Sequence, residues 1–147
     1  MRKRIISLTV LSMLLAVFVY TAYGNNNYQK KSKKKYVLNF TLKDLDGKTV
    51  DFNKFKGKVI ILDVWDTWCP PCKAEIPDFI KLYSRYKDKG FLMIGAAIGR
   101  EGVKNVKDFI KKYEINYPIV LFDRKIMKIF GSFRGIPTTY VIDKNGE

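Results

Sequence analysis

A cysteine pair with two residues between its members places the tightest constraint on the fold of this chain. The motif Trp-Cys-Pro-Pro-Cys at 68–72 follows an apolar, β-branched run at 59–65, which is typical of a fully buried strand. After the motif, apolar residues recur at helical spacing as far as residue 89. The cysteines are therefore expected in the first turn of a helix that leaves a central strand, where prolines are tolerated. Free N–H groups and the helix dipole favour an anion there, so the pattern predicts a redox centre with a reactive thiolate.

The inventory of metal-binding and acid–base side chains narrows the chemistry further. The 147 residues include two cysteines, both in this motif, and no histidine. No other thiol exists for a structural disulfide framework. The lack of imidazole removes histidine acid–base catalysis, haem ligation by histidine and most zinc sites. We therefore expect no bound metal.

Residues 1–24 are interpreted as a signal peptide or membrane anchor. Three cations at 2–4 precede a mainly apolar stretch without a charge at 5–23. A stretch of that length can span a bilayer, which favours an uncleaved anchor with the remaining chain outside the cytoplasm. A small-x-small pattern at 22–24 keeps cleavage open. The expected location is extracytoplasmic, in the periplasm or at the outer face of the cell membrane, either membrane-anchored or secreted.

The rest of the chain divides into a linker and one domain. Residues 25–35 are polar and lysine-rich, as expected for a flexible spacer. Residues 36–147 form the predicted domain, and the chain's 47% hydrophobic content suits a core of ordinary size. The formal net charge of +14 is dispersed and forms no single stripe. This favours a solvated basic surface over attraction to anionic lipid, and it argues against nucleic acid as a partner.

The order of hydrophobic patterns predicts an α/β fold. A hairpin is expected at 40–52 around a turn at 46–47, and a connector at 52–58 leads to the central strand. A second buried strand at 91–97 follows the cysteine helix, so strand, helix and strand form a βαβ unit with a parallel pair. Further along, the pattern predicts a helix at 103–113, a short apolar run at 117–122, a helical segment at 126–130 that ends at Gly131, and a strand within 135–143 followed by a turn.

Together, Trp68, the Cys-x-x-Cys pair, Pro77 and the Gly-Ile-Pro-Thr-Thr segment at 135–139 resemble the thioredoxin superfamily. Within it, the chain is similar to the TlpA/ResA-like branch of membrane-anchored, extracytoplasmic thiol-disulfide oxidoreductases. The N-terminal anchor, the leading hairpin, the extra helix at 103–113 and the Cys-x-x-Cys-Lys-x-Glu pattern ending at Glu75 carry this similarity.

The resemblance implies a thioredoxin-like fold, in which helices flank a central mixed β-sheet and an N-terminal β-hairpin precedes it. It also implies a part in cell redox homeostasis and cytochrome c biogenesis. Members of the branch usually continue with one more strand and a terminal helix, so we expect this domain to be C-terminally incomplete.

Four residues are predicted to carry the chemistry. Cys69 is expected to be the exposed nucleophile and Cys72 the more buried resolving thiol of a redox-active disulfide, with no other cofactor. Glu75 shares a helix face with Cys72 and is predicted to shuttle its proton; an acid that complements the helix dipole is the alternative. Asp63 lies in an apolar run, where an ionised carboxylate is costly. A raised pKa and a role as proton acceptor for Cys72 are therefore predicted, with a hydrogen-bonded structural carboxyl as the alternative.

Five further residues are predicted to contact substrate. Trp68 is expected to be a substrate-facing lid, with Pro70 and Pro71 beside it in the motif. The resemblance adds Ile136 and Pro137, and it implies that Pro137 is cis and presents backbone to an extended substrate. The remaining charged residues near the motif are interpreted as solvated surface: Asp66, Lys73 and Asp78.

The predicted function is a thiol-disulfide oxidoreductase that reduces protein disulfides outside the cytoplasm, with a membrane thiol protein as its electron donor. An oxidising dithiol protein and a thiol peroxidase of the same superfamily stay open as alternatives. A peroxidatic cysteine would need a different Pro/Thr/Arg setting, and a copper-delivery protein would want a histidine beside the cysteines. The last alternative is a binding module without redox activity.

Overall fold

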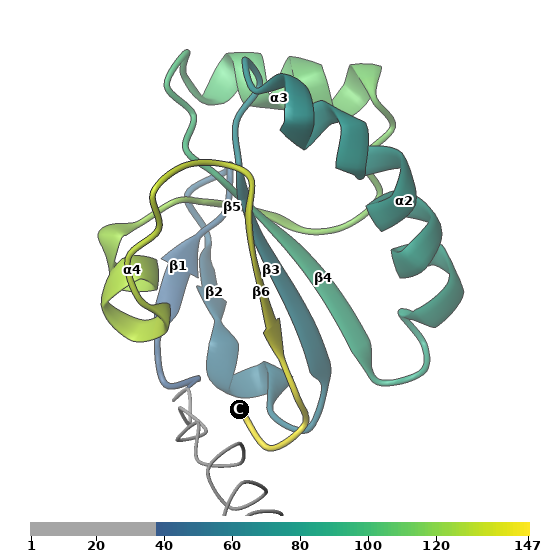
Figure 1. Cartoon of the computed structure of the whole chain (residues 1–147), viewed down its shortest axis with the longest axis vertical. Coiled ribbons are helices and arrows are strands. Elements are labelled where there is room, and N and C mark those ends of the chain that lie inside the picture. Colours follow the sequence, from purple (N-terminus) through teal and green to yellow (C-terminus); the bar gives the residue numbers. More distant parts are fainter. Residues whose placement is uncertain (1–37) are drawn as a thin grey trace, which may run out of the picture. The chain divides into compact units, whose positions relative to one another are not determined.

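The computed structural model describes residues 38–147, which are built on a four-stranded sheet (Figure 1). The strand order is β5-β4-β3-β6. β3, β4 and β5 run parallel, whereas β6 pairs antiparallel with β3. The bounds are Val59–Trp65 for β3, Phe91–Ala97 for β4, Ile119–Leu121 for β5 and Thr138–Ile142 for β6. The predicted mixed sheet and its βαβ unit are thus confirmed.

Within this part of the chain, three α-helices connect the strands. α2 (Pro70–Tyr86) joins β3 to β4, α3 (Val103–Lys112) joins β4 to β5, and α4 (Arg124–Phe130) joins β5 to β6. In Figure 1, α2 and α3 lie on one side of the sheet and α4 lies on the other, together with the hairpin. α2 continues through Pro77, so that proline does not end the helix; the bend expected there stays a prediction. The helix stops three residues before the predicted limit, because the chain turns toward β4 at Gly90 with a φ of 76°.

The predicted hairpin precedes β3 and is followed by a short helix. β1 (Thr41–Lys43) pairs antiparallel with β2 (Thr49–Asp51). Asp44 closes the turn, since its Oδ1 accepts from two backbone N–H groups of the loop at 2.9 and 2.8 Å. The segment predicted as a plain connector begins instead with a 3₁₀ helix, η1 (Phe52–Phe55).

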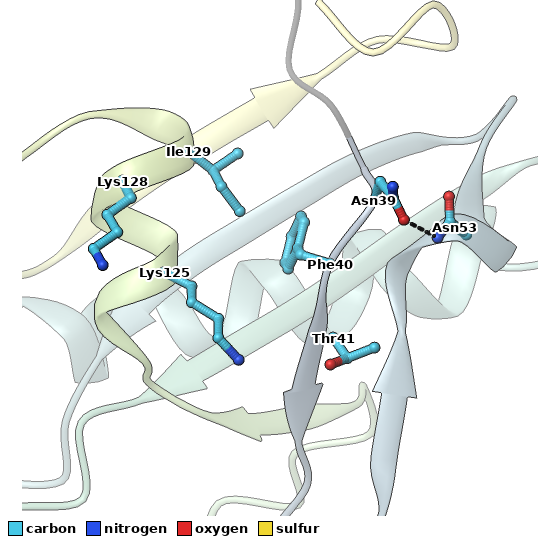
Figure 2. A pocket seen from close by; sticks show the side chains of 7 residues that line it. All are labelled: Asn39, Phe40, Thr41, Asn53, Lys125, Lys128 and Ile129. Carbon is cyan, nitrogen blue, oxygen red and sulfur yellow. Dashed lines mark hydrogen bonds between the residues drawn. The ribbon is translucent and has the colours of Figure 1, made fainter.

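An open hollow of about 450 Å³ lies between the hairpin side and α4 (Figure 2). It is lined by Asn39, Phe40, Thr41, Asn53, Lys125, Lys128 and Ile129. Asn53 Nδ2 donates a hydrogen bond to Asn39 Oδ1 at 2.8 Å across one end of it. None of the residues predicted for the redox site lines this hollow, so we assign it no part in the chemistry.

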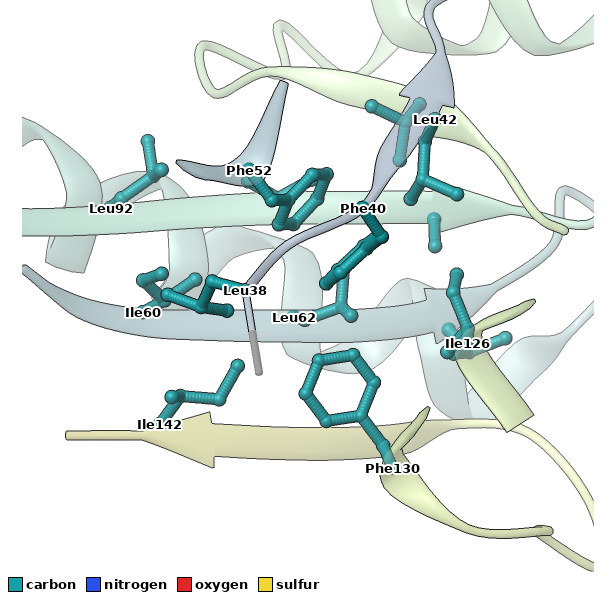
Figure 3. Close-up of a cluster of buried hydrophobic side chains, with 14 residues drawn as sticks. Leu38, Phe40, Leu42, Phe52, Ile60, Leu62, Leu92, Ile126, Phe130 and Ile142 are labelled. Atoms are coloured by element: carbon teal, nitrogen blue, oxygen red, sulfur yellow. The ribbon is translucent and has the colours of Figure 1, made fainter. Parts of the chain in front are cut away.

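Strand alternation divides the core into two clusters, one on each face of the sheet. On the hairpin face, Ile60, Leu62 and Val64 of β3 are fully buried. They pack in one cluster with Phe52 of η1 and Phe130 of α4 (Figure 3). The hairpin and its 3₁₀ helix therefore cover one face of the central strand and form part of its core.

The opposite face of β3 carries the residues that lead to the cysteines. Asp63 and Trp65 alternate with the hairpin-facing residues and so face α2. Trp65, Cys69 and Cys72 belong to the second buried cluster, which α2 and α3 complete. The sheet thus places a carboxyl on the same face as the redox motif.

The predicted anchor and linker, residues 1–24 and 25–35, lie outside the described residues. Between residues 38 and 147, no helix is long and apolar enough to cross a bilayer.

Candidate active site

The cysteine pair begins α2. Cys69 is the N-cap residue of the helix, and the next two positions are Pro70 and Pro71, which have no N–H groups. The first N–H of the helix therefore belongs to Cys72, and it donates to Cys69 Sγ at 3.3 Å. The two cysteines form a disulfide, with an S–S length of 2.06 Å and a Cα–Cα distance of 5.3 Å. The sulfur of Cys69 thus serves the helix as its cap.

The predicted difference in exposure between the two cysteines is wrong for this state. Cys69 and Cys72 are each 2% exposed. Both sulfurs are joined in the disulfide, and both cysteines pack in the cluster with Trp65, against which Ile136 also packs. Cys69 therefore cannot be told from Cys72 by exposure in the oxidised molecule.

The residues predicted to contact substrate surround this pair. Trp68 is 41% exposed, and Pro70 and Pro71 are exposed as well. Ile136 and Pro137 are half-buried, and the peptide bond between them is cis, as the resemblance implies. The structure therefore presents an open rim next to the cysteines, made from the start of α2 and the loop before β6.

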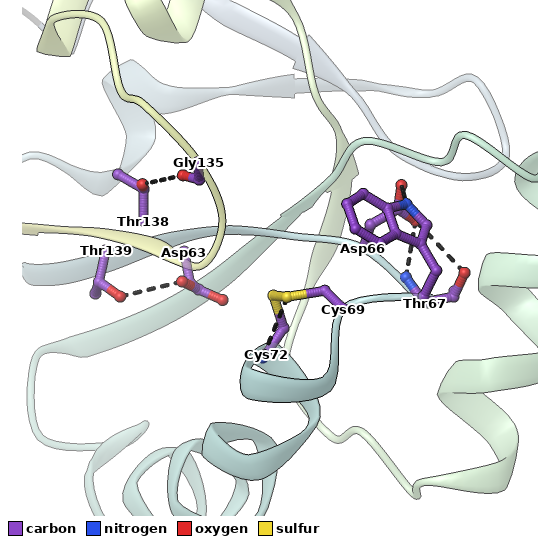
Figure 4. The surroundings of a disulfide bond; sticks show 9 residues. Asp63, Asp66, Thr67, Cys69, Cys72, Gly135, Thr138 and Thr139 are labelled. Atoms are coloured by element: carbon purple, nitrogen blue, oxygen red, sulfur yellow. Dashed lines mark hydrogen bonds between the residues drawn. A yellow bond between two sulfur atoms is a disulfide. The ribbon is translucent and has the colours of Figure 1, made fainter.

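Asp63 lies behind the disulfide, and its carboxyl points toward the sulfur atoms in Figure 4. It is 4% exposed and accepts a hydrogen bond from Thr139 Oγ1 at 3.1 Å. Burial raises the pKa of Asp63 from 3.8 to about 7, the hydrogen bond from Thr139 opposes this rise, and the negative charge of Glu75 adds to it. The predicted upward shift has the expected direction and cause.

Two further groups share this region. Glu75 is half-buried, and its Oε2 is buried with no hydrogen-bond partner among residues 38–147. Tyr117 is 5% exposed, and burial together with the charge of Asp63 raises the pKa of its phenol. The structure thus brings Asp63 and Glu75 together beside the cysteines, and it adds Tyr117 and Thr139, which the sequence analysis placed in an apolar run and in a strand without giving them a role.

The interpretation of Asp66 as solvated surface is wrong. Asp66 is 0% exposed, and its carboxylate accepts from the backbone N–H of Thr67 (2.8 Å), the indole Nε1 of Trp68 (2.8 Å) and the backbone N–H of Arg100 (3.2 Å). Asp66 follows the last residue of β3 and accepts from N–H groups of the turn that comes after it. The alternation of buried and exposed residues ends with the strand, so sequence periodicity does not predict whether Asp66 is buried. Figure 4 places Asp66 and Asp63 on opposite sides of the disulfide in this view.

The other two charged residues near the motif differ from each other. Asp78 has a side chain that is 81% exposed and pairs with Lys81 at 3.2 Å, so it is surface as predicted. Lys73 is half-buried, and its Nζ lies 5.8 Å from the centre of the Phe109 ring. The half-burial of Lys73 is explained by burial of its aliphatic stem, and its charged end need not be buried.

Comparisons with known proteins agree with this geometry. Residues 34–147 match the model of the AhpC/TSA family. The chain is 35% identical over 146 residues to the thiol-disulfide oxidoreductase ResA of Bacillus cereus, which covers 98% of this chain and 82% of the relative. It is 32% identical over 149 residues to ResA of Bacillus subtilis, covering 99% and 82%.

Solved structures show the same fold. A thiol:disulfide interchange protein of Chlorobium tepidum superposes with a TM-score of 0.70 at 33% identity, covering 79% of this chain and 83% of that one. StoA of Bacillus subtilis gives 0.61 at 31% identity, covering 74% and 81%. A secreted disulfide oxidoreductase of Mycobacterium tuberculosis gives 0.65 at 26% identity, covering 75% and 80%.

The thioredoxin-like fold, the Cys69–Cys72 pair and these relatives lead to one assignment. The chain belongs to the AhpC/TSA family of the thioredoxin superfamily and, within it, to the ResA-like thiol-disulfide oxidoreductases.

Proposed function

We propose that this oxidoreductase reduces disulfides of protein substrates outside the cytoplasm. The observation that carries the proposal is the disulfide at the start of α2, where the Cys69 sulfur caps the helix. Trp68 and two prolines are exposed beside it. The Cys69–Cys72 pair itself carries the two electrons, and the reaction requires no other cofactor.

The reaction proceeds through a mixed disulfide. In the reduced enzyme, the Cys69 thiolate attacks one sulfur of the substrate disulfide, a bond forms between these sulfurs, and the other substrate sulfur leaves as a thiolate that takes up a proton. Cys72 then loses its proton and attacks Cys69, which releases the first substrate sulfur and forms the Cys69–Cys72 disulfide. The substrate has gained two electrons, and the enzyme is oxidised.

Cys69 is the better nucleophile because of its place in the helix. Its sulfur accepts a hydrogen bond from the first N–H of α2 and lies at the positive end of the helix dipole. The hydrogen bond and the dipole both stabilise a thiolate. Cys72 lies one turn further in and lacks this position. The division of labour therefore follows from helix geometry, although exposure does not distinguish the two cysteines.

Asp63 and Glu75 supply the proton acceptor for Cys72 in this proposal. Asp63 has a pKa of about 7 because of its burial, so it exchanges protons near neutral pH. Glu75 raises that pKa through its charge and has a buried oxygen free to accept. The two carboxyls therefore form one proton-holding pair on the α2 face.

Neutralising the pair tests this role. Asp63→Asn and Glu75→Gln should each slow release of the mixed disulfide moderately, and the double variant should slow it more, while the first attack by Cys69 is nearly unchanged. General bases typically contribute about 10²–10⁴-fold, and sharing reduces each single effect. Rapid-mixing kinetics on a model disulfide separate attack from release. If release is unchanged in the double variant, solvent is the base and both carboxyls are structural.

Support for the compartment and the partners comes from outside the described residues. The charged start and apolar stretch at 1–24 favour membrane attachment with the domain exported, and one structural relative is a secreted protein. In an oxidising compartment, a reductant needs electrons delivered across the membrane. We therefore propose a membrane thiol protein as donor, and the disulfide of an apocytochrome c C-x-x-C-H site as one class of substrate.

Cysteine variants test the proposed function directly. Cys72→Ser should accumulate mixed disulfides through Cys69, because the resolving thiol is gone, whereas Cys69→Ser should trap nothing. The reduced wild type should reduce insulin and an oxidised C-x-x-C-H peptide. Trapping that is equal in both variants would remove the assigned cysteine roles. Faster consumption of peroxide than of disulfides would favour a thiol peroxidase, and oxidation of dithiol peptides without any reduction would favour an oxidant.

A further inference from the structure

The buried carboxylate of Asp66 has no part in the chemistry proposed above. It is as buried as the core side chains, yet it lies three residues before the nucleophile. Its backbone carbonyl accepts the N–H of Cys69 at 3.2 Å, so it also closes the turn that leads into α2. A charged group in such a place calls for a reason, because burial of a carboxylate is costly unless it is well bonded.

The partners of Asp66 come from two separate segments. Its Oδ1 accepts from the N–H of Thr67 at 2.8 Å, and its Oδ2 accepts from the indole of Trp68 at 2.8 Å and from the N–H of Arg100 at 3.2 Å. Arg100 belongs to the loop between β4 and α3. A single carboxylate therefore ties the end of β3, the indole beside the nucleophile and the neighbouring loop together.

The same loop holds Trp68 from a second direction. The guanidinium of Arg100 lies 4.6 Å from the centre of the Trp68 ring, a cation–π distance. Thr67 Oγ1 donates to Glu101 Oε2 at 3.0 Å, which joins the loop to the turn once more. Trp68 is thus held at its N–H edge and over its ring, while 41% of it stays exposed at the rim of the site.

From this arrangement we propose that Asp66 is a positioning residue, which fixes the indole of Trp68 as a preformed wall for polypeptide substrates. The proposal rests on the substrate-binding role of Trp68 in the proposed function. An aromatic side chain that is already immobile loses little conformational freedom when a substrate packs on it. Asp66 therefore acts on substrate affinity through Trp68 and touches no reacting atom.

The chemistry of the partners explains why an aspartate stands here. The four groups bonded to the carboxylate are three N–H donors and, at 3.5 Å, the hydroxyl of Thr67, and an ionised carboxylate is an acceptor only. An asparagine would turn an NH₂ group toward one of these donors. An alanine would leave the indole N–H and the Arg100 N–H without an acceptor, at the usual cost of an unpaired polar group.

Steady-state kinetics on two kinds of substrate test the proposal. Asp66→Ala should raise KM for an oxidised peptide substrate by about 3- to 10-fold, the range expected when one side chain must be ordered on binding. The kcat for the peptide and the rate with bis(2-hydroxyethyl) disulfide, which is too small to need the wall, should change far less. Asp78→Ala, which removes an acid that is 81% exposed, is the matched control and should behave as wild type.

A double variant shows whether Asp66 acts through Trp68. Trp68→Ala should raise the peptide KM, and adding Asp66→Ala to it should raise KM no further, because the indole that Asp66 holds is gone. Effects that multiply in the double variant would overturn the proposal. If the wild type reduces no peptide disulfide at all, the proposed function fails, and the spectroscopic test below still decides the role of Asp66.

The indole N–H signal reports the contact itself. The chain has two tryptophans, and the Trp65 indole N–H has no hydrogen-bond partner among residues 38–147, so two distinct signals are expected in an NMR spectrum of the labelled protein. In Asp66→Ala the Trp68 signal should move upfield and exchange faster with solvent, while the Trp65 signal stays.

The variant Trp68→Phe assigns the two signals. It removes only the N–H donor of an exposed ring, so it remains usable should Asp66→Ala fail to fold. It should raise the peptide KM in the same direction; an unchanged KM in Trp68→Phe, or an unchanged Trp68 signal in Asp66→Ala, would refute the proposal.

Discussion

Asp63 shows how a buried carboxyl can be both costly and useful. Its neighbours on β3 are apolar, and Thr139 supplies the hydrogen bond to Oδ1 that the structure shows. One such bond does not offset the loss of hydration, so the carboxyl keeps its proton to about pH 7. A proton held at that pH is available for exchange with a thiol, but the folded protein bears the cost whenever the carboxyl ionises.

This cost predicts a pH-dependent stability that Asp63→Asn should remove. Below about pH 4 the carboxyl is protonated in both the folded and the unfolded chain. Between about pH 4 and pH 7 the Asp63 carboxyl ionises in the unfolded chain but stays protonated in the folded one. The free energy of unfolding therefore falls as pH rises, and it levels off above pH 7. The difference between 3.8 and about 7 corresponds to a loss of about 4 kcal/mol at most. Urea unfolding of the two oxidised proteins from pH 4 to pH 8 measures it.

Thr139→Val provides the control for this prediction. Loss of the hydroxyl removes the bond that lowers the pKa of Asp63, so the decline in stability should extend to higher pH. Parallel pH profiles for wild type and Asp63→Asn would mean that Asp63 titrates alike in the folded and unfolded chain.

Single residues mark the limit of what the sequence predicts at this site. The upward pKa shift of Asp63 could be predicted because a polar residue in an apolar, alternating strand has a known fate. The burial of Asp66 could not, because its donors include the N–H of Arg100, which is 34 positions away. The exposure of Cys69 was mispredicted, because both cysteines pack in the buried cluster with Trp65 and each is 2% exposed.

At the scale of elements, a glycine in β4 makes room for a large side chain of β3. Gly95 stands opposite Asp63 in the parallel pair. A Cβ there would lie 2.7 Å from the indole Nε1 of Trp65 and 2.6 Å from Cδ1 of Ile119. The isoleucine tip can swing away, but the Trp65 ring is 1% exposed and packs on Phe109 at a centroid distance of 5.3 Å. Close approach of the Trp65 indole is therefore what the glycine allows.

Gly95→Ala should destabilise the protein by about 1–3 kcal/mol, the usual cost of overpacking a core. Denaturant unfolding measures it, with Gly135→Ala as the matched control, because a Cβ at Gly135 meets no described atom within 4 Å. The control should stay within about 0.5 kcal/mol of wild type. Equal stability of both variants and wild type would show that Trp65 can move.

Most elements could be predicted from their local patterns. Three of the four sheet strands, the hairpin and the helices at 70–86, 103–112 and 124–130 follow from periodicity, turn residues and terminal glycines, whereas β5 at 119–121 was recognised only as part of a short apolar run. The 3₁₀ helix at 52–55 was missed, because Phe52 is buried by contacts with Phe40 and the sheet and not by any local rule. Its ring stacks on Phe40 at 4.3 Å.

For the molecule as a whole, the fold follows from pattern, whereas its location depends on residues outside the described part. Two buried clusters on opposite faces of one sheet account for the thioredoxin-like body. The case for export rests on the charged start and the apolar stretch at 1–24, which the sequence pattern predicts to be a targeting segment.

A protease added to intact cells without their outer layers should digest the domain if it is exported. The expected result is loss of full-length protein, while a cytoplasmic protein in the same cells stays whole. Protection of the domain would place it in the cytoplasm and contradict the compartment that the N-terminal pattern predicts.

The distance along the chain between Asp63 and Thr139 also has a consequence for biosynthesis. The hydrogen-bonded pair spans 76 positions, and Thr139 enters the sheet only through β6, the last strand of the described chain. During translation, both cysteines are therefore added to the chain well before Thr139, whose hydroxyl donates to Asp63. If Asp63 takes the proton of Cys72, as we propose, a chain still being synthesised carries both thiols while their proton acceptor lacks its hydrogen bond from Thr139.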